Sequence, residues 1–385
     1  MEDIYELAII GGGISSCTFA SEIINSGFKG KIAIFEAGRN LGGRASSRLS
    51  LKNKGWILNH GAPNLNIHKE GNGTDLNKFL KKLLEKEIIE ADQSEFYTFD
   101  KRLNLSNIND CEFTKGNLYM PNTYMSDLSE NILLMNNKFN KIDLYFETLI
   151  NNIIFINNYW VISSTNGIQL KCRFLVSSSS LILHDRSIDV LGVNQIPLRR
   201  AIKFKRSSTI DKIINNVNHQ DHIKRLSFLI YTNSDYSYKD SYEKKNRYFK
   251  FDEDIVSEFG FERIIFQRQL NNSLAIVIQT TNQDLFFKGS FNGNKLISIE
   301  TLLDTYNKVF EKSKIINKLS DFKDISLMEW RASQPFGFMV SSDLQICKKY
   351  KIGFCGDWFD TNGFARIEGA ILSGINLSKK ILEII

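Results

Sequence analysis

The sequence contains no long apolar run, since no stretch approaches the ~18 uninterrupted apolar residues of a membrane-spanning helix. We therefore expect a soluble protein without a membrane span. Its first residues, "MEDIYELAII", are acidic and continue directly into a predicted strand, so they lack the basic flank and long apolar core of a secretion signal. These two absences predict a cytoplasmic location.

Cysteine is scarce, and its spacing indicates neither a disulfide framework nor a metal centre. The chain has five cysteines, with no CxxC pair and no metal-ligand spacing to the scattered histidines. They are Cys17, Cys111, Cys172, Cys347 and Cys355. This pattern predicts a reduced intracellular compartment and no bound metal.

No block of one charge sign is present, although the formal net charge is +6. A modest positive charge attracts phosphorylated ligands without specifying one. Tyrosines and lysines interleave in "YTNSDYSYKDSYEKKNRYFKF", but acids lie among them and no nucleic-acid recognition fold is apparent. We expect a solvated loop there, and a small-molecule substrate rather than a nucleic acid as partner. The sequence sets no oligomeric state.

The length of 385 residues exceeds what one hydrophobic core usually organises, and 42% apolar residues are enough for two cores. The stretch "YELAIIGGGISSCTFASEIINSGFKGKIAIFEAG" predicts a strand, a glycine turn, a helix and a second strand. Gly11 and Gly13 allow backbone N–H groups to approach a pyrophosphate at the N-terminus of the helix. Glu36 ends the second strand, where a carboxylate accepts hydrogen bonds from a ribose.

One position departs from the G-x-G-x-x-G pattern, because Ser16 stands where the third glycine is expected. A small serine is compatible with slightly wider helix–strand packing. Glycine-rich turns also occur without a ligand, but the complete order of strand, turn, helix, strand and acid favours dinucleotide binding.

The stretch "FEAGRNLGGRASSR" adds a second glycine turn behind Glu36. Gly42 and Gly43 permit backbone conformations closed to other residues, and Arg44 offers a planar guanidinium to a phosphate. The alternative is a polar surface turn in which Arg44 is solvated.

The C-terminal part predicts a short apolar strand at residues 351–355, followed at its carboxyl end by Gly356 and Asp357. Ligands bind at such strand ends in open parallel sheets. An amphipathic helix is expected from about Arg366. Gly369 and Gly374 would each weaken it by ~1 kcal/mol relative to alanine, so we expect another backbone or a flat ligand to lie close to them. The alternative is a simple docking helix.

The motifs "GGGISS", "FEAGRNLGGRASSR" and "LNHGAPNL", with "EWRASQP" and "GFCGDWFDTNGFARIEGAILSG" near the end, resemble the amine-oxidase superfamily of flavoproteins. Within it the chain is most similar to the renalase-like branch. The resemblance implies an α/β fold: a Rossmann-type FAD-binding domain with a parallel sheet like that of glutathione reductase, and an inserted substrate domain of antiparallel sheet plus helices. The expected FAD-binding segments are 1–75, 140–182 and 340–385, and the expected substrate-domain segments are 76–139 and 183–339.

The resemblance also implies which residues bind FAD. Asp357 would bond the flavin's polyol chain or pyrophosphate region, and the backbone at Ile367 would direct a helix N-terminus at the pyrimidine edge. Cys355 lies within the strand, unlike the family's covalent cysteine, so we expect a buried thiol and noncovalent FAD. The full set is Gly11, Gly13, Ile14, Ser15, Glu36, Ala37, Gly43, Arg44, Leu149, Ile150, Gly356, Asp357, Arg366 and Ile367.

The middle of the chain carries weaker patterns. Residues 141–182 alternate in a way that predicts an antiparallel meander, and the family places Leu149 or Ile150 of this segment beside the adenine. Further strands are predicted at 201–206, 226–232, 263–269 and 274–280, with a helix at 298–312. Together they predict a separate sheet-and-helix substrate domain.

Three residues are candidates for catalysis. His60 either faces the flavin or is held by a hydrogen bond within a turn. Trp330 either walls the substrate space or belongs to the core. Arg331 meets either an anionic substrate or a structural carboxylate.

The resemblance implies a flavin oxidoreductase that takes a hydride from a small reduced substrate. Dihydronicotinamide dinucleotide isomers are the substrates of the renalase-like branch, and dioxygen is the expected acceptor. Oxidation of an amine or a polyene is the alternative reaction. An alternative of another class is a flavin-free binding protein, because the Rab GDP-dissociation inhibitors use a related fold.

Overall fold

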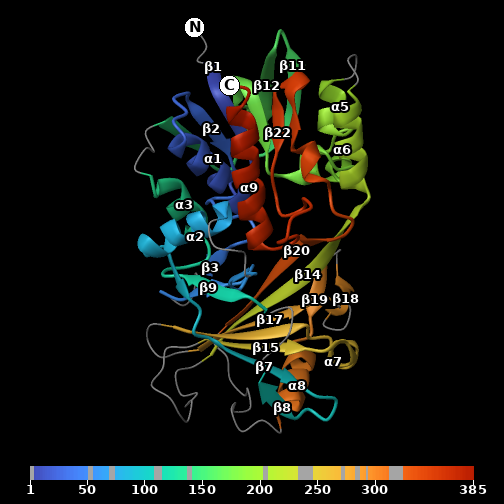
Figure 1. Cartoon of the computed structure of the whole chain (residues 1–385). Helices are drawn as coiled ribbons and strands as arrows, with labels where there is room; N and C mark the ends of the chain where they lie inside the picture. The colour runs from blue at the N-terminus through green and yellow to red at the C-terminus, as the bar shows by residue number, and fades with distance from the viewer. Residues whose placement is uncertain are drawn as a thin grey trace.

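The computed structural model describes eleven ranges of the chain, and these build two large sheets (Figure 1). One sheet is largely parallel and lies in the upper half of Figure 1, and the other lies below it. The described residues are 4–50, 55–68, 74–107, 115–136, 141–202, 207–232, 246–269, 274–281, 287–291, 294–311 and 324–385.

The first sheet has eight strands and the order β10-β2-β1-β13-β12-β11, with β22 paired to β13 and β21 paired to β22. Strands β10, β2, β1, β13 and β22 run parallel to their neighbours in this set, whereas β11, β12 and β13 form an antiparallel meander. The bounds are β1 Ile4–Ile10, β2 Ile32–Phe35, β10 Ile142–Tyr145, β11 Ile150–Ile156, β12 Tyr159–Ser164, β13 Gln169–Ser177, β21 Ile346–Cys347 and β22 Ile352–Phe354.

Strand β1 is apolar because both of its faces are covered. Leu7 and Ile9 belong to a core that includes the helices α1 (Ile14–Asn25) and α9 (Ile367–Leu382). Ala8 and Ile10 belong to the core on the other face, which includes α6 (Ser208–Asn218). The predicted order of strand, glycine turn, helix and strand is confirmed, and it forms a Rossmann-like unit in an α/β fold.

Helix α9 lies so close to neighbouring backbone, including that of α1, that its glycines leave no room for a Cβ atom. A Cβ added to Gly374 would lie 2.5 Å from the carbonyl oxygen of Ser15 on α1, and one added to Gly369 would lie 2.2 Å from that of Gly363. The close approach of another backbone, expected from the two glycines, is therefore present at both. Two further helices, α2 (Asp75–Glu85) and α3 (Asp127–Leu134), add apolar side chains to the same core. The division of the chain into domain segments stays a prediction.

The second sheet has seven strands and the order β20-β14-β17-β16-β15-β7-β8. All its pairs are antiparallel except β15 with β7. Its bounds are β7 Glu95–Phe99, β8 Leu105–Asn107, β14 Gln220–Tyr231, β15 Arg247–Phe251, β16 Arg263–Arg268, β17 Leu274–Thr280 and β20 Asp324–Gly337, with helices α7 Glu253–Phe259 and α8 Ile299–Phe310. The long strands β14 and β20 extend from this sheet toward the first one (Figure 1).

Smaller elements complete the described part of the chain. They are the pair β3 Ser47–Leu49 and β4 Ile57–Asn59, the sheet of β5 Leu65–Ile67, β6 Ile89–Ala91 and β9 Asn117–Pro121, the pair β18 Phe287–Phe291 and β19 Asn294–Ile297, and the helices α4 Ser187–Leu191 and α5 Pro197–Ala201. Among the residues in these described ranges, no helix is long and apolar enough to cross a membrane.

Several expectations for the middle of the chain need correction. The strand predicted at 201–206 is wrong at its start, where α5 ends at Ala201 after a proline at its first turn, and residues 203–206 lie outside the described part. Strand β10 is not part of the meander, because it pairs in parallel with β2. In the expected solvated loop, residues 247–251 form β15, and 233–245 lie outside the described residues. The strands at 226–232, 263–269 and 274–280 are confirmed, and the helix predicted at 298–312 is confirmed as α8, although residue 312 lies outside the described part.

The α1–α9 contact gives a test of the packing. Gly374→Ala would normally stabilise a helix by up to about 1 kcal/mol. Here the added methyl group meets the α1 backbone, so we expect a loss of about 1–3 kcal/mol in the free energy of unfolding. Urea denaturation measures it, with the half-buried Asn376→Ala on the same helix as control. A gain in stability at Gly374 would contradict the close packing.

Candidate functional site

A cavity of about 580 Å³ lies where the parallel strands of the first sheet end and the second sheet begins. The residues that follow four of these strands line it. They are Gly11–Gly13 after β1, Glu36 after β2, Ser178–Ser180 after β13 and Gly356–Trp358 after β22. The opposite wall comes from β14, β15, β16, β17 and β20. A site of this size at the carboxyl ends of parallel strands fits a small molecule or a cofactor.

The first glycine turn leaves the N-terminus of α1 open toward the cavity. Gly11 adopts a φ of +100°, and a Cβ there would lie 2.4 Å from Oγ of Ser178. Gly13 caps α1 without a side-chain hydrogen bond, and a Cβ on it would meet no atom within 4 Å. Ile14 and Ser15 of the first turn also line the cavity. The backbone N–H groups and the helix dipole therefore suit an anion at this end.

Glu36 is fixed at the end of β2 by two backbone donors. Its Oε2 accepts from the N–H of Gly12 and its Oε1 from the N–H of Gly38, both at 2.7 Å. A carboxylate has about four lone-pair sites, so acceptor capacity remains for a further donor such as a ribose hydroxyl. Ser16, in place of the third glycine, is fully buried and donates to the carbonyl oxygen of Gly13 at 2.8 Å.

Arg44 joins the two ends of the chain within the cavity. Its Nη2 donates to Oδ1 of Asp357 at 2.5 Å, and its Nη1 to the carbonyl oxygen of Ser333 at 3.4 Å. Gly43 lines the cavity beside it. Of the three arginines in the motif, only Arg44 lines the cavity, whereas the Arg39 side chain is 88% exposed beside Glu147. The Arg44 side chain is 40% exposed and is paired with Asp357, which favours a place in the cavity over a solvated surface turn. Its role in cofactor binding stays a prediction.

The start of α9 forms another part of the lining. Arg366 precedes the helix and Ile367 begins it, and both line the cavity with Gly356 and Asp357. The Arg366 guanidinium is held by Glu368, with 3.1 Å between Nη2 and Oε2.

Three predicted cofactor residues lie elsewhere. Ala37 is exposed, and neither Leu149 nor Ile150 lines the cavity. The side chain of Ile150 is buried in a core. A backbone contact of these residues with a ligand stays a prediction.

One of the three catalytic candidates lines the cavity, and the other two do not. Trp330 lines the cavity, but Arg331, the next residue along β20, is exposed and does not. His60 is 4% exposed and lies behind Trp330, with 5.3 Å between the ring centroids. Its Nε2 is 3.3 Å from Oγ of Ser46, which lies 14 positions earlier, so the ring is held against a neighbouring segment and not within its own turn. Burial, assisted by the charge of Arg48, lowers the pKa of His60 to about 4, so it is neutral at pH 7.

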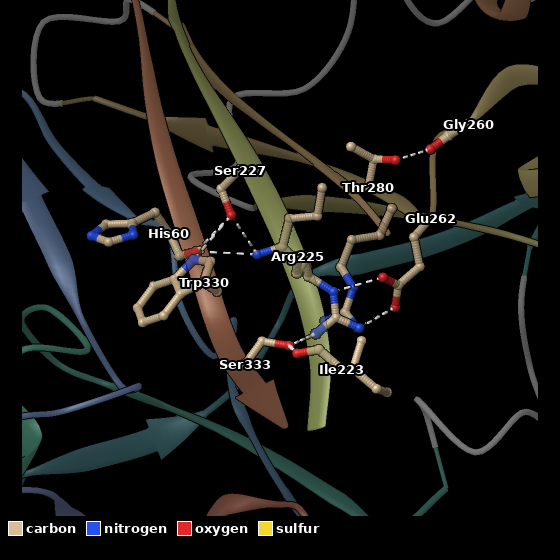
Figure 2. Close-up of polar contacts among 11 residues, drawn as sticks. His60, Ile223, Arg225, Ser227, Gly260, Glu262, Thr280, Trp330 and Ser333 are labelled. Carbon is tan, nitrogen blue, oxygen red and sulfur yellow. Dashed lines mark hydrogen bonds and ion pairs between the residues drawn. The ribbon is translucent and has the colours of Figure 1, made fainter. Parts of the chain in front are cut away.

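The sequence reasoning missed a polar network on the second sheet (Figure 2). Arg225 donates from Nε and Nη2 to both carboxylate oxygens of Glu262, at 2.6 and 2.7 Å, and from Nη1 to Oγ of Ser333 at 3.0 Å. Arg263 approaches the same carboxylate, with 3.1 Å between Nη2 and Oε1. All four residues line the cavity. A pattern in the sequence could have indicated this network. Polar residues alternate with apolar ones at the start of otherwise apolar strands, as in "RLSFLIY".

The charges of this network control the ionisation of Glu262. Burial alone raises the pKa of a carboxyl group, but Arg263 and Arg225 outweigh it and lower the pKa of Glu262 to about 2. Glu262 is therefore ionised at neutral pH and holds both guanidinium groups in place.

The described cysteines are buried, and Cys111 lies outside the described residues. Burial raises the pKa of Cys355 to about 12. This thiol belongs to the core beneath Gly356, as expected.

Comparisons with known proteins agree with this architecture. A family model described as an NAD(P)-binding Rossmann-like domain matches residues 9–83. Putrescine oxidase bound to putrescine has a TM-score of 0.66 at 10% identity, with 100% of both chains covered. Cyclohexylamine oxidase from Brevibacterium oxydans IH-35A has a TM-score of 0.66 at 12% identity, with 99% of both chains covered. No curated protein matches the sequence significantly. Because the sequence identities are this low, the comparison shows that the chain shares the fold of the two oxidases and nothing further.

The Glu262 network predicts a specific dependence of stability on pH. Glu262→Gln leaves two largely buried guanidinium groups without their carboxylate, so we expect a loss of about 3–5 kcal/mol near pH 7. Because the folded-state pKa is depressed, the parent has this stabilisation above the ordinary pKa of about 4.5 and loses it as pH falls toward 2. The difference in free energy of unfolding between parent and variant is therefore constant from pH 5 to 7 and shrinks below about pH 4.5. A difference independent of pH down to about 2 would refute the assigned ion pairs.

Proposed function

We propose that the protein is an FAD-dependent oxidoreductase that takes a hydride from a small reduced substrate. The observation that carries the proposal is the meeting of the glycine turn, Glu36 and Asp357 at one cavity whose opposite wall belongs to a different sheet. A dinucleotide bound along the first wall leaves the second wall to contact a substrate. The shared fold with two oxidases supports this choice.

The residues present fit FAD. The open N-terminus of α1 and the guanidinium of Arg44 suit the pyrophosphate, Glu36 suits the ribose, and Asp357 suits the polyol chain. The N-terminus of α9 at Ile367 suits the pyrimidine edge of the ring. A bound flavin supplies the redox chemistry, because its ring accepts a hydride and later releases electrons to an acceptor. Noncovalent binding is proposed because Cys355 is fully buried in the core.

The chain itself contributes binding and positioning. Trp330 presents its indole at the cavity, held by a hydrogen bond from Nε1 to Oγ of Ser227 at 3.3 Å. A flat, fixed side chain can orient a planar substrate and exclude water. His60 does not line the cavity and lies against the indole, and its pKa of about 4 makes it a weak base, so we assign it no proton transfer.

For the finer function we propose a renalase-like oxidase of dihydronicotinamide dinucleotide isomers, with dioxygen as acceptor. Hydride loss from such a substrate leaves an aromatic cation and requires no base. This agrees with the state of His222 on β14, the histidine that lines the described cavity, because burial and the charge of Arg186 lower its pKa to about 3. Its phosphates also suit a cavity lined by more cations than carboxylates. Amine oxidation is the second candidate, because the two similar structures are oxidases named for amines.

The purified protein provides the first test. We expect the absorption of oxidised flavin in the visible range, bleached by candidate reductants under anaerobic conditions. A protein that takes up no FAD would instead support a flavin-free binding protein on this fold.

Cofactor retention tests the assigned residues. Glu36→Ala removes a ribose acceptor and Arg44→Ala removes a guanidinium, and charge-assisted hydrogen bonds contribute about 1.5–3 kcal/mol each. We expect FAD dissociation constants at least about tenfold higher in both variants, measured by flavin fluorescence on dilution. The exposed Arg39→Ala is the matched control and should match the parent. Equal values for all three variants would remove Glu36 and Arg44 from the cofactor site.

The pH dependence of flavin reduction tests the role of His60. Trp330→Ala should slow anaerobic flavin reduction by poorer substrate placement, while the parent rate stays nearly flat across pH ~5–8. Stopped-flow absorbance of the holoprotein measures both. A steep fall on acidification that His60→Gln removes would show a required base and favour amine oxidation.

A further inference from the structure

A row of polar side chains crosses the cavity face of the second sheet. Ser227 on β14 lies opposite Gln279 on β17, Gln279 lies opposite Arg263 on β16, and Arg263 lies opposite Lys250 on β15. Directly opposed residues point to the same face of a sheet, and three of these four line the cavity. The row therefore forms one continuous polar wall.

The wall carries more positive than negative charge. Lys250 and Arg263 are opposed cations, an arrangement that destabilises a pair of strands. Arg263 shares the carboxylate of Glu262 with Arg225. Within the described part of the chain, no carboxylate lies within ion-pair distance of Lys250. Three cations thus face the cavity with a single carboxylate among them.

Packing does not account for this charge. Two residues further along the same strands, on the same face, Val277 and Ile265 are apolar and belong to a small buried core with Tyr248. Apolar residues would therefore fit this face at no desolvation cost, whereas buried cations are costly unless paired. A ligand that brings negative charge into the cavity would offset that cost.

We propose that this wall binds the anionic group of the substrate, a carboxylate or a phosphate, between Lys250 and Arg263. The proposal rests on the proposed function, because it assigns the substrate side of the same cavity. The wall lies across the cavity from the glycine turn, so its anion is distinct from a cofactor pyrophosphate at α1. Arg225 and Glu262 position the Arg263 guanidinium, and Lys250 supplies a charge that the anion neutralises. A cationic substrate would be repelled at this wall.

Binding of simple ions to the holoprotein tests the proposal. The probes are benzoate, inorganic phosphate and benzylammonium, each compared with sodium chloride at equal ionic strength. Thermal unfolding and the flavin absorption spectrum report binding. We expect benzoate or phosphate to raise the melting temperature and perturb the spectrum, and whichever acts identifies the carboxylate or the phosphate as the group bound. Benzylammonium should do neither.

Variants locate the bound ion. Lys250→Met should raise the anion dissociation constant at least about tenfold, and Lys250→Gln, which keeps a polar side chain, gives a second reading if the first folds poorly. Lys224→Met is the matched control, because Lys224 is an exposed lysine that does not line the cavity. The Lys224→Met variant should bind the anions with the same dissociation constant as the parent.

Three results would overturn the proposal: equal anion affinity in the parent and both Lys250 variants, no response to either anion, or preferential binding of benzylammonium. Loss of FAD from the Lys250 variants with unchanged anion binding would assign the lysine to the cofactor instead. If the protein takes up no FAD, the proposed function fails, while the thermal measurements on the flavin-free protein still decide whether the wall binds anions.

Discussion

The ion pair between Arg44 and Asp357 connects the parts on which the cavity depends. It joins residues 313 positions apart, and Arg44 also reaches the backbone of Ser333 on β20 of the second sheet. The Asp357 side chain is only 9% exposed, so the guanidinium of Arg44 stabilises its charge. In return, the carboxylate fixes the direction of that guanidinium. An arginine has five N–H donors, and these two contacts use two of them. One side chain therefore bridges the two walls and keeps N–H donors for a ligand.

The Rossmann-like part could be predicted from the sequence because its signals are local. The buried strand β1, the turn at Gly11 and the acid at Glu36 follow one another within a short stretch, and each has one dominant physical reason. Gly374 predicted a close backbone contact, which α1 supplies. Asp357 was a predicted cofactor residue, from its place after a strand and from the family resemblance. Its ion pair with Arg44 was not predicted, because it joins two distant parts of the chain.

The second wall could not be predicted in the same way, because it depends on strand pairing across long distances. Arg225 and Glu262 are 37 positions apart and meet only through the register of β14, β17 and β16. Lys250 lies in a polar, tyrosine-rich stretch whose composition indicates a loop, yet pairing with β16 makes its last residues a strand. Arg331 was a candidate by its place beside Trp330, but the alternation along β20 directs neighbouring side chains to opposite faces.

Two of the acids that line the cavity orient arginines, whereas Glu36 accepts hydrogen bonds from backbone N–H groups. Asp357 holds Arg44 on one wall and Glu262 holds Arg225 and Arg263 on the other. With the pKa of Glu262 near 2 and that of His60 near 4, neither group changes charge at neutral pH. A third group, His222 on β14, also lines the cavity, and burial beside Arg186 lowers its pKa to about 3. None of these three groups has a pKa near neutral pH, which is the value that suits proton abstraction. The proposed hydride transfer needs no base and depends on how substrate and flavin are oriented, which the fixed side chains of the two sheets would control.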